Sequence, residues 1–406
     1  MRLDPDNSRT AYIVYIVTLG LLCAFGPLCT DIYLPGLPAV TADFATDPAT
    51  AQLSMTSSFL GLALGQIIIG PVSDAYGRRG PLLISLIIFI ITSYLCAISP
   101  TIEIFILWRF FQGIAGAGGV VLARSIAADK FKGSALTQFM SLLMSINSIA
   151  PIAGPVIGSF IITVSTWPTV FYFRTVLGVV LLLLSFADVP ESHTPTEEQK
   201  QVLGAIKSMF RELGNKKFVL AVLALSFIMG GFFGYLAASP FIFQVIYSFT
   251  PMQYSLAFGS ITVCIAITSM LAGRLSRRIK DQKIISFGYL GALTASCLIM
   301  FFALFQPETV WPVLLSLMLF CAMMGTIQTV GFGIVMRLKK GGAGAASGIL
   351  GVMHFLFGAL SSPFMGIMGD HSMIPLGVCM VSGCILGILC LRLALYGKDS
   401  DTQAGH

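Results

Sequence analysis

The stretch GPVSDAYGRRG, residues 70–80, ends a largely apolar segment at 53–73 with glycines, an aspartate and two arginines. A similar stretch, GRLSRRIKDQK at residues 273–283, follows another apolar segment at 254–273. Both combine residues that allow tight turns with basic residues just past a hydrophobic run. The pair predicts two polar loops that end membrane-spanning helices, at corresponding places in two related halves of the chain.

The composition is that of an integral membrane protein. The 406 residues are 56% hydrophobic and 10% charged, with a mean hydropathy of +0.89, whereas soluble domains carry about 25% charged residues. The first apolar run, 11–29, is too long for a cleaved signal sequence, so we expect it to remain as a span. The nine cysteines lie in apolar runs without metal-ligand spacing, and we expect no disulfide framework, metal or cofactor.

The apolar segments predict twelve transmembrane helices, because one helical crossing of a bilayer needs about 20 apolar residues. We expect an all-α fold of two pseudo-symmetric six-helix bundles. The expected spans are 11–35, 53–73, 81–99, 102–123, 137–160, 167–187, 218–243, 254–273, 284–305, 310–335, 345–368 and 373–391.

Charge distribution predicts the orientation of these spans. Of 24 Lys and Arg residues, 22 lie in the amino-terminal tail, the carboxy-terminal end or the loops that share their side, and the alternate loops have none. Basic loops stay in the cytoplasm, so we expect both termini there and a bacterial inner-membrane location. The net charge of +6 is explained by this topology and needs no nucleic-acid partner.

The most polar internal stretch divides the chain. We predict an amino-terminal bundle at 1–189, a cytoplasmic linker at 190–217 and a carboxy-terminal bundle at 218–406. Apolar residues in the linker recur at a spacing typical of an amphipathic helix on the inner membrane face, where it would tether the halves.

Three motifs, together with TDIYLPGLP at 30–38, give the chain an end-to-end resemblance to the major facilitator superfamily. Within that superfamily it resembles the twelve-span drug:proton antiporters, and most closely the bicyclomycin and chloramphenicol resistance subgroup. The first motif is G-x-x-x-D-x-x-G-R-R, with Gly70, Asp74, Gly77, Arg78 and Arg79. The second has Arg109, Gln112, Gly113, Gly118, Ala123, Arg124 and Asp129, and the third, A-P-x-x-G-P-x-x-G, has Ala150, Pro151, Gly154, Pro155 and Gly158.

The resemblance implies a role for each motif. The first motif, joined by Arg124 and Asp129, would form a conformational latch that holds the outward-facing state. The third motif, carried by Pro151, Gly154, Pro155 and Gly158, would mark an antiporter rather than a symporter. Prolines and glycines in one membrane helix also permit a bend or a close helix contact.

Asp31 is the one acid that falls clearly inside an expected span, and a charge there is disfavoured unless it has a function or a partner. Arg109 and Arg174 are the basic residues left inside spans, each roughly 10 Å from the outer surface at a rise of about 1.5 Å per residue. We predict that Asp31 and Arg109 form a proton-coupling site. Alternatively, Asp31 is a helix-end residue in contact with water, and Arg174 serves in a structural ion pair.

Softer candidates for the substrate site, beside Asp31, lie mainly in the second half. They are Tyr235, Phe241, Phe243, Gln244, Gln328 and His354. His354 is the one histidine inside a span and can titrate, but a packing role is an alternative. Better-known relatives carry a second acid where this chain has Cys23, which favours neutral or anionic substrates over dications.

We therefore predict a proton-coupled antiporter that exports amphiphilic small molecules by alternating access, acting as a monomer in the bilayer. A dedicated exporter of a metabolite, such as an amino-acid derivative or a siderophore, is the alternative. The third motif disfavours proton-coupled import. An enzyme is not expected, because the sequence has no H-E-x-x-H, no G-x-S-x-G and no P-loop.

Overall fold

The computed structural model describes residues 9–195, 202–340 and 342–396, and within these ranges every regular element is a helix. The predicted all-α fold is confirmed. The helices are α1 Arg9–Cys23, α2 Phe25–Asp31, η1 Leu34–Gly36, α3 Leu37–Asp43, α4 Pro48–Tyr76, α5 Arg79–Ala97, α6 Ile102–Lys130, α7 Gly133–Val164, α8 Trp167–Asp188, α9 Val202–Arg211, η2 Glu212–Gly214, α10 Lys216–Pro240, the π-helix η3 Phe241–Ile246, α11 Pro251–Leu275, α12 Asp281–Phe305, α13 Trp311–Leu338, α14 Ala343–Phe364 and α15 Ile374–Tyr396.

Eleven helices of the described chain are long and apolar enough to cross a membrane by themselves. The first predicted span completes the set of twelve, but it is divided at Ala24 into α1 and α2. Pro27 explains the division, because proline has no N–H to donate to the carbonyl of Cys23 one turn earlier. The chain then continues through η1 and α3, so the first span is less regular than predicted.

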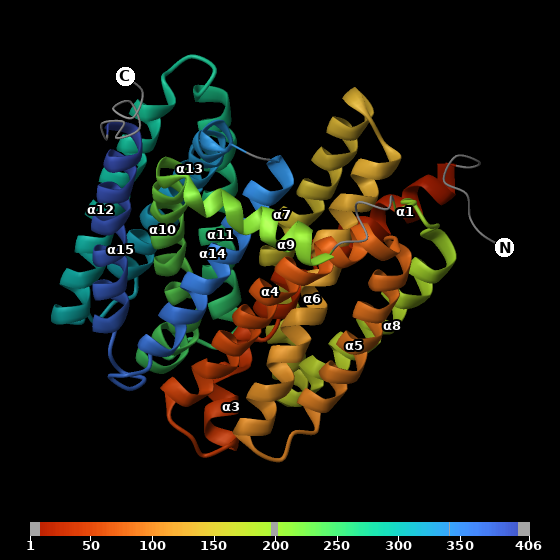
Figure 1. Cartoon of the computed structure of the whole chain (residues 1–406). Helices are drawn as coiled ribbons and strands as arrows, with labels where there is room; N and C mark the ends of the chain where they lie inside the picture. The colour runs from red at the N-terminus through yellow and green to blue at the C-terminus, as the bar shows by residue number, and fades with distance from the viewer. Residues whose placement is uncertain (1–8, 196–201, 341, 397–406) are drawn as a thin grey trace.

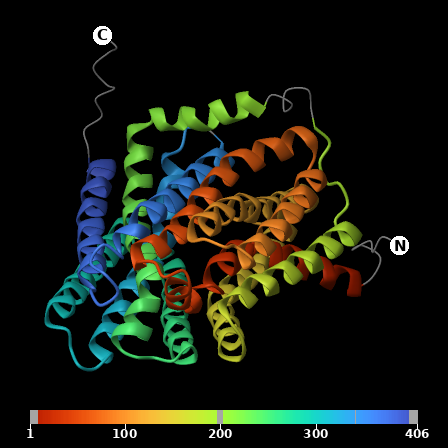
Figure 2. The same ribbon diagram turned by 90° about the horizontal axis from the view of Figure 1, so that it is seen from below.

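The helices form two groups (Figure 1). The first group contains α1–α8 and the second contains α10–α15, while α9 lies across the inner ends of α4 and α14. Figure 2 shows α9 as the helix that leads into α10 along the edge of the molecule. Residues 196–201 and both chain ends lie outside the described residues. The domain boundaries at 189/190 and 217/218 therefore stay a prediction, as does the attachment of the linker to the membrane.

Glycines set the closest packing in the first group. α4 and α6 make the most extensive contact of any two helices. At their crossing, a Cβ added to Gly61 would lie 2.2 Å from the carbonyl oxygen of Phe110, and one added to Gly113 would lie 2.2 Å from that of Ser58. Small residues let two membrane helices approach to backbone contact in this way.

The two groups are joined mainly on one side, opposite the basic loops. We call this the outer side and the side of the basic loops the inner side. The side-chain amide of Gln52 donates to the carbonyl of Ala237 at 3.2 Å, and the hydroxyl of Ser362 donates to the carbonyl of Gln52 at 3.2 Å. The amide of Gln244 donates to the carbonyl of Pro35 at 3.1 Å. These contacts close the outer ends of the groups against each other.

Asp47 caps α4 at the outer side. Its carboxylate accepts from the backbone N–H of Thr50 at 3.0 Å and from the Thr50 hydroxyl at 2.6 Å. These hydrogen bonds, the hydroxyl first, hold the pKa of Asp47 below its usual value. A lowered pKa in the folded state means that the carboxylate stabilises the fold above the unfolded pKa, and that this stability is lost as the pH falls through the folded pKa.

We expect Asp47→Ala to lower the free energy of unfolding at pH 7 by about 0.5–1 kcal/mol, the low end for an N-cap because Asp47 is exposed to solvent. Thermal unfolding of the purified protein in detergent measures the difference. The gap between wild type and variant should close as the pH is lowered through the folded pKa of Asp47. A gap that stays constant with pH would contradict a charged cap.

Candidate functional site

Asp31 is the last residue of α2 and is 4% exposed, so its side chain faces neither lipid nor bulk water. The hydroxyl of Thr30 donates to Oδ1 of Asp31 at 2.7 Å, and no described basic side chain lies within ion-pair distance of the carboxylate. The alternative of a water-exposed helix end does not fit this burial. The charge state of a carboxyl group that is buried and held by one hydrogen bond depends strongly on small changes around it.

The proline–glycine motif of α7 lies directly against Asp31. A Cβ added to Gly154 would lie 3.1 Å from the Cβ of Asp31, and one added to Gly158 would lie 2.0 Å from the carbonyl oxygen of Ile32. The absence of side chains at both glycines lets α7 pack on the backbone of the Asp31 segment. The third motif and the buried acid are therefore parts of one site.

The same stretch of α7 reaches the second group of helices through hydroxyl groups. The Ser255 hydroxyl on α11 donates to the carbonyl of Pro155 at 2.7 Å, and the Ser159 hydroxyl donates to the carbonyl of Pro251 at 2.6 Å. The two hydroxyl oxygens are 2.5 Å apart. Since each hydroxyl carries one hydrogen, the set can rearrange between these bonds. Asp31 is thus one helix away from the boundary between the groups.

A second buried cluster holds both intramembrane arginines. Arg109 on α6 is fully buried and Arg174 on α8 is 1% exposed. Oε1 of Gln112 accepts from the guanidinium of Arg109 and, at 3.4 Å, from that of Arg174, while its amide donates to Ser93 at 2.7 Å. The ring of Phe171 lies 4.9 Å from the Arg174 guanidinium carbon. One glutamine thereby fixes two cations in the core of the first group.

The two clusters interact electrostatically. Among the described residues, Arg174 is the cation whose charge acts on Asp31, and Asp31 also acts on Tyr235 and Tyr254 across the boundary in the second group. Arg109 is connected to the acid less directly. Its guanidinium carbon lies 5.1 Å from the ring centre of Tyr33, which is two residues after Asp31. The site therefore comprises one acid, two cations and tyrosines from both groups.

A third cluster lies at the inner ends of the first group. Arg78 forms ion pairs with Asp74 at 2.5 Å and Asp129 at 2.9 Å. The carboxylate of Glu191 accepts from the backbone N–H groups of Arg78 at 2.7 Å and Arg79 at 3.1 Å. It therefore caps the start of α5, where partial positive charge favours an anion.

Gly77 makes this approach possible. Its φ of +90° is a conformation that side chains rarely adopt, and a Cβ there would lie 2.6 Å from the Glu191 carboxylate. The backbone conformation and the close approach of Glu191 thus explain why position 77 of the first motif is a glycine.

The sequence pattern of the Major Facilitator Superfamily matches residues 19–363. The chain belongs to the Major Facilitator Superfamily. It is 33% identical over 402 residues to an uncharacterized MFS-type transporter, YdgK, of Bacillus subtilis (strain 168), with 98% of each chain covered. It is 26% identical over 380 residues to the bicyclomycin resistance protein homolog of Haemophilus influenzae, covering 92% of this chain and 95% of the relative.

A crystal structure of a D-xylose–proton symporter has the same fold, with a TM-score of 0.75, 17% sequence identity and coverage of 94% of this chain and 98% of that one. The predicted superfamily, its fold and the resemblance to resistance transporters are confirmed. This MFS protein is a multi-pass membrane transporter and not an enzyme.

Arg124 does not join the inner cluster in this MFS transporter. Its side chain is exposed and forms no ion pair within the described residues. Five residues separate it from Asp129, which at about 100° per residue places the two roughly 140° apart around α6. The helix therefore directs Arg124 to another face than Asp129, and its inclusion in the latch stays a prediction.

The softer candidates divide into two kinds. Phe243 is fully buried against Phe249 and Tyr254 inside the second group, whereas Gln244 donates to the carbonyl of Pro35 and so takes part in the outer closure. Gln328 donates to the carbonyl of Leu225 at 3.1 Å inside the second group.

Tyr235, Phe241 and His354 remain as candidate lining residues. Tyr235 is 1% exposed, stacks on Phe258, and its hydroxyl has no hydrogen-bond partner among the described residues. The Nε2 atom of His354 is also without a described partner, and Phe241 is 5% exposed. A buried polar atom without a partner loses free energy relative to water, so the Tyr235 hydroxyl and the His354 ring are the better candidates to bind a substrate.

Two functional candidates were not assigned a role from sequence. Gln112 was noted only as part of a motif, although its spacing of three residues from Arg109 places both on one face of α6. Tyr33 contacts Arg109 and hydrogen-bonds Ser54 at 3.2 Å. Tyr33 lies two residues after Asp31. The chain after α2 is not a regular helix, so the direction of the Tyr33 side chain could not be predicted from helical spacing.

Proposed function

We propose that this MFS transporter exports amphiphilic small molecules across the bacterial inner membrane in exchange for protons. The observation that carries the proposal is the burial of Asp31 beside the α7 glycines, within electrostatic reach of Arg174 and of tyrosines in the second group. A titratable acid that reaches the boundary between the two groups through one helix suits coupling, because its charge can favour one arrangement over the other.

The proton would act on the hydrogen bond from Thr30, on the attraction to Arg174 and on the packing against α7. Charged Asp31 accepts a hydrogen bond from Thr30 and attracts Arg174. Protonation removes the attraction between Asp31 and Arg174 and gives the carboxyl group a hydrogen to donate. The preferred position of the carboxyl end of α2 against α7 would therefore differ between the charged and the neutral form. A bound substrate that competes for Arg174 or Tyr235 would then exclude the charged carboxylate, and proton and substrate would occupy the site in turn.

Charge at the site supports neutral or anionic substrates. Two guanidinium groups and one carboxyl are buried here, and Cys23 stands where better-known relatives carry a further acid. Aromatic side chains from both groups also meet across the boundary: the ring centres of Phe59 and Phe233 are 4.6 Å apart and that of Phe355 is 5.6 Å from Phe233. Apolar walls with few polar groups are typical of pockets for small molecules.

The structure supports an inward-facing stage of the cycle. Direct hydrogen bonds join the groups at the outer side, while the ion pairs of Arg78 stay within the first group. We propose that the Arg78 cluster contacts the second group only when the inner ends close, which is how it would hold an outward-facing state. Two such arrangements are the minimum for alternating access.

The test is the direction of proton movement in sealed vesicles that contain the purified protein and a trapped pH dye. Vesicles are prepared with an acidic interior, and a panel of neutral, anionic and cationic amphiphiles is added outside. We expect an antiported compound to enter as protons leave, so the interior becomes more alkaline. Acidification of the interior together with the substrate, from an acidic exterior, would indicate symport and overturn the proposal.

A dedicated metabolite exporter would give the same proton signal, so a second measurement separates the two. A susceptibility panel and metabolite profiling of a deletion strain should show wider drug sensitivity if drug export is the function. Accumulation of one compound inside cells, without a change in susceptibility, would favour the dedicated exporter.

A further inference from the structure

α11 and α12 leave an apolar groove between them at the inner side of the second group. Each packs along α13, but the two have little contact with each other. In the first group, α4 and α5 pack on α6 at the corresponding places and also touch each other. The second group therefore has an opening on its lipid-facing side, with α13 as its floor.

The groove has a volume of about 520 Å³ and is lined almost wholly by apolar atoms. Leu271, Leu275 and Phe287 form an exposed rim, buried Ala272 and Ile284 line the walls, and Met323 and Thr326 of α13 form the floor. The threonine hydroxyls within it are already used, since those of Thr268 and Thr326 both donate to the carbonyl of Ala322, at 2.7 and 3.3 Å. The groove therefore offers a surface for an apolar chain, and the threonine hydroxyls in its depth are already hydrogen-bonded.

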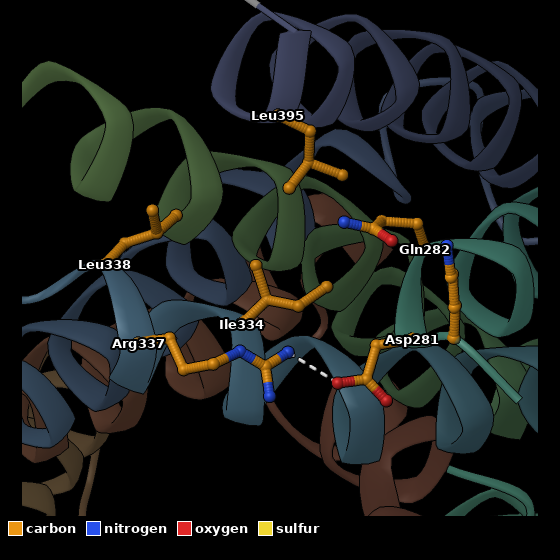
Figure 3. Close-up of a pocket in the computed structure, with 7 residues that line it drawn as sticks. Asp281, Gln282, Ile334, Arg337, Leu338 and Leu395 are labelled. Carbon is orange, nitrogen blue, oxygen red and sulfur yellow. Dashed lines mark hydrogen bonds and ion pairs between the residues drawn. The ribbon is translucent and has the colours of Figure 1, made fainter. Parts of the chain in front are cut away.

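Positive charge lies at the inner mouth of the groove. Lys283 is an exposed lining residue, and the loop before it adds Arg274, Arg277, Arg278 and Lys280. The one acid of this loop, Asp281, is already paired with Arg337 at 2.5 Å (Figure 3). Lys283 forms no ion pair with a described residue. The mouth therefore has a net positive charge that nothing described neutralises.

We propose that this groove binds one acyl chain of an anionic phospholipid of the inner leaflet, with the phosphate at Lys283. The lining extends along α11 from Thr268 to Leu275, a length of about 10 Å at 1.5 Å per residue. This length matches the part of one leaflet that lies next to the headgroups. An apolar trough that ends in lysine at the membrane interface is complementary to a lipid with a charged headgroup. A lipid without net charge would place a chain in the groove but would gain no electrostatic attraction from Lys283.

Native mass spectrometry of the purified, delipidated protein tests this site. The protein is incubated with phosphatidylglycerol or phosphatidylcholine of identical acyl chains. We expect preferential retention of one phosphatidylglycerol and a loss of that preference by about fivefold or more in Lys283→Glu, the effect of one interfacial cation. The matched control is Lys132→Glu, an exposed inner-side lysine of the first group. Equal losses in both variants would mean attraction to the basic face in general and would overturn the proposal.

Fluorescence quenching of a tryptophan placed on the exposed rim is a second test, and it changes no residue in the depth of the groove. The three native tryptophans, 108, 167 and 311, lie at the outer ends of spans, so a tryptophan at Phe287 on the rim reports locally. We expect phosphatidylglycerol with brominated chains, at low mole fraction, to quench Phe287→Trp more strongly than brominated phosphatidylcholine does. A tryptophan at Leu183, equally exposed on α8, should show no such preference. The same quenching at both positions would exclude a specific site.

Discussion

Asp31→Asn is expected to reduce substrate-induced proton movement in vesicles to the level of empty vesicles. Asparagine keeps the shape of the side chain and can still accept from Thr30, but it cannot gain or lose a proton. The acid is 4% exposed and has no second described carboxyl beside it to take over. We expect the protein to fold and to retain substrate binding, measured by ligand-dependent thermal stabilisation in detergent.

The matched control is Asp47→Asn, which removes an exposed acid at the outer side. Its proton signal should equal that of the wild type, apart from the small loss of stability expected for an altered cap. If Asp31→Asn and Asp47→Asn gave equal proton signals, Asp31 would have no role in coupling. If Asp31→Asn unfolded the protein, its charge would serve the fold, and Asp31→Glu would then distinguish charge from shape.

Gly158→Ala is expected to impair transport more severely than any other single methyl addition in α7. The added Cβ would lie 2.0 Å from the carbonyl oxygen of Ile32 and 2.9 Å from its carbonyl carbon. Neither atom can move without moving the backbone next to Asp31. Overpacking of this kind lowers the free energy of unfolding by about 1–3 kcal/mol, and here the displacement falls on the coupling site itself.

Thermal unfolding and transport rates, measured side by side, check this expectation. Gly259→Ala is the control: Gly259 lies on α11, which packs against α7, and its added Cβ would meet a single atom of Ile152 at 3.8 Å, an ordinary contact. We expect Gly259→Ala to behave like the wild type. Normal stability and transport in Gly158→Ala would show that α7 does not lie against the Asp31 segment in the working protein.

The sequence was sufficient for the fold because membrane spans leave a strong signal in length and charge. Hydrophobic runs and basic loops gave twelve spans, and the superfamily was evident from motifs in which several glycines have a steric reason. Gly77 needs a positive φ, and Gly154 and Gly158 need backbone contact. The division of the first span at Ala24 was also within reach, since Pro27 removes one helical hydrogen bond.

The candidate site was less predictable, because it depends on which faces of tilted helices meet. Asp31 was found from its unusual place in an apolar run, but the choice of Arg109 as its partner rested only on an estimated depth in the membrane, which says nothing of the direction in which a side chain points. The structure brings the charge of Arg174 to Asp31 and joins the two arginines through Gln112. The π-helix η3 changes the direction of Phe243 and Gln244 relative to regular helical spacing, so the contact of Gln244 with Pro35 could not be predicted from the sequence.

The outer closure consists of neutral groups. Amides and hydroxyls bind backbone carbonyls there, and none of the described contacts that join the groups at that side is an ion pair. Dissolved ions screen charged pairs over a Debye length of about 8 Å at physiological ionic strength, but they act weakly on uncharged hydrogen bonds. Separation of the two groups at the outer side should therefore proceed equally well in dilute and in saline surroundings.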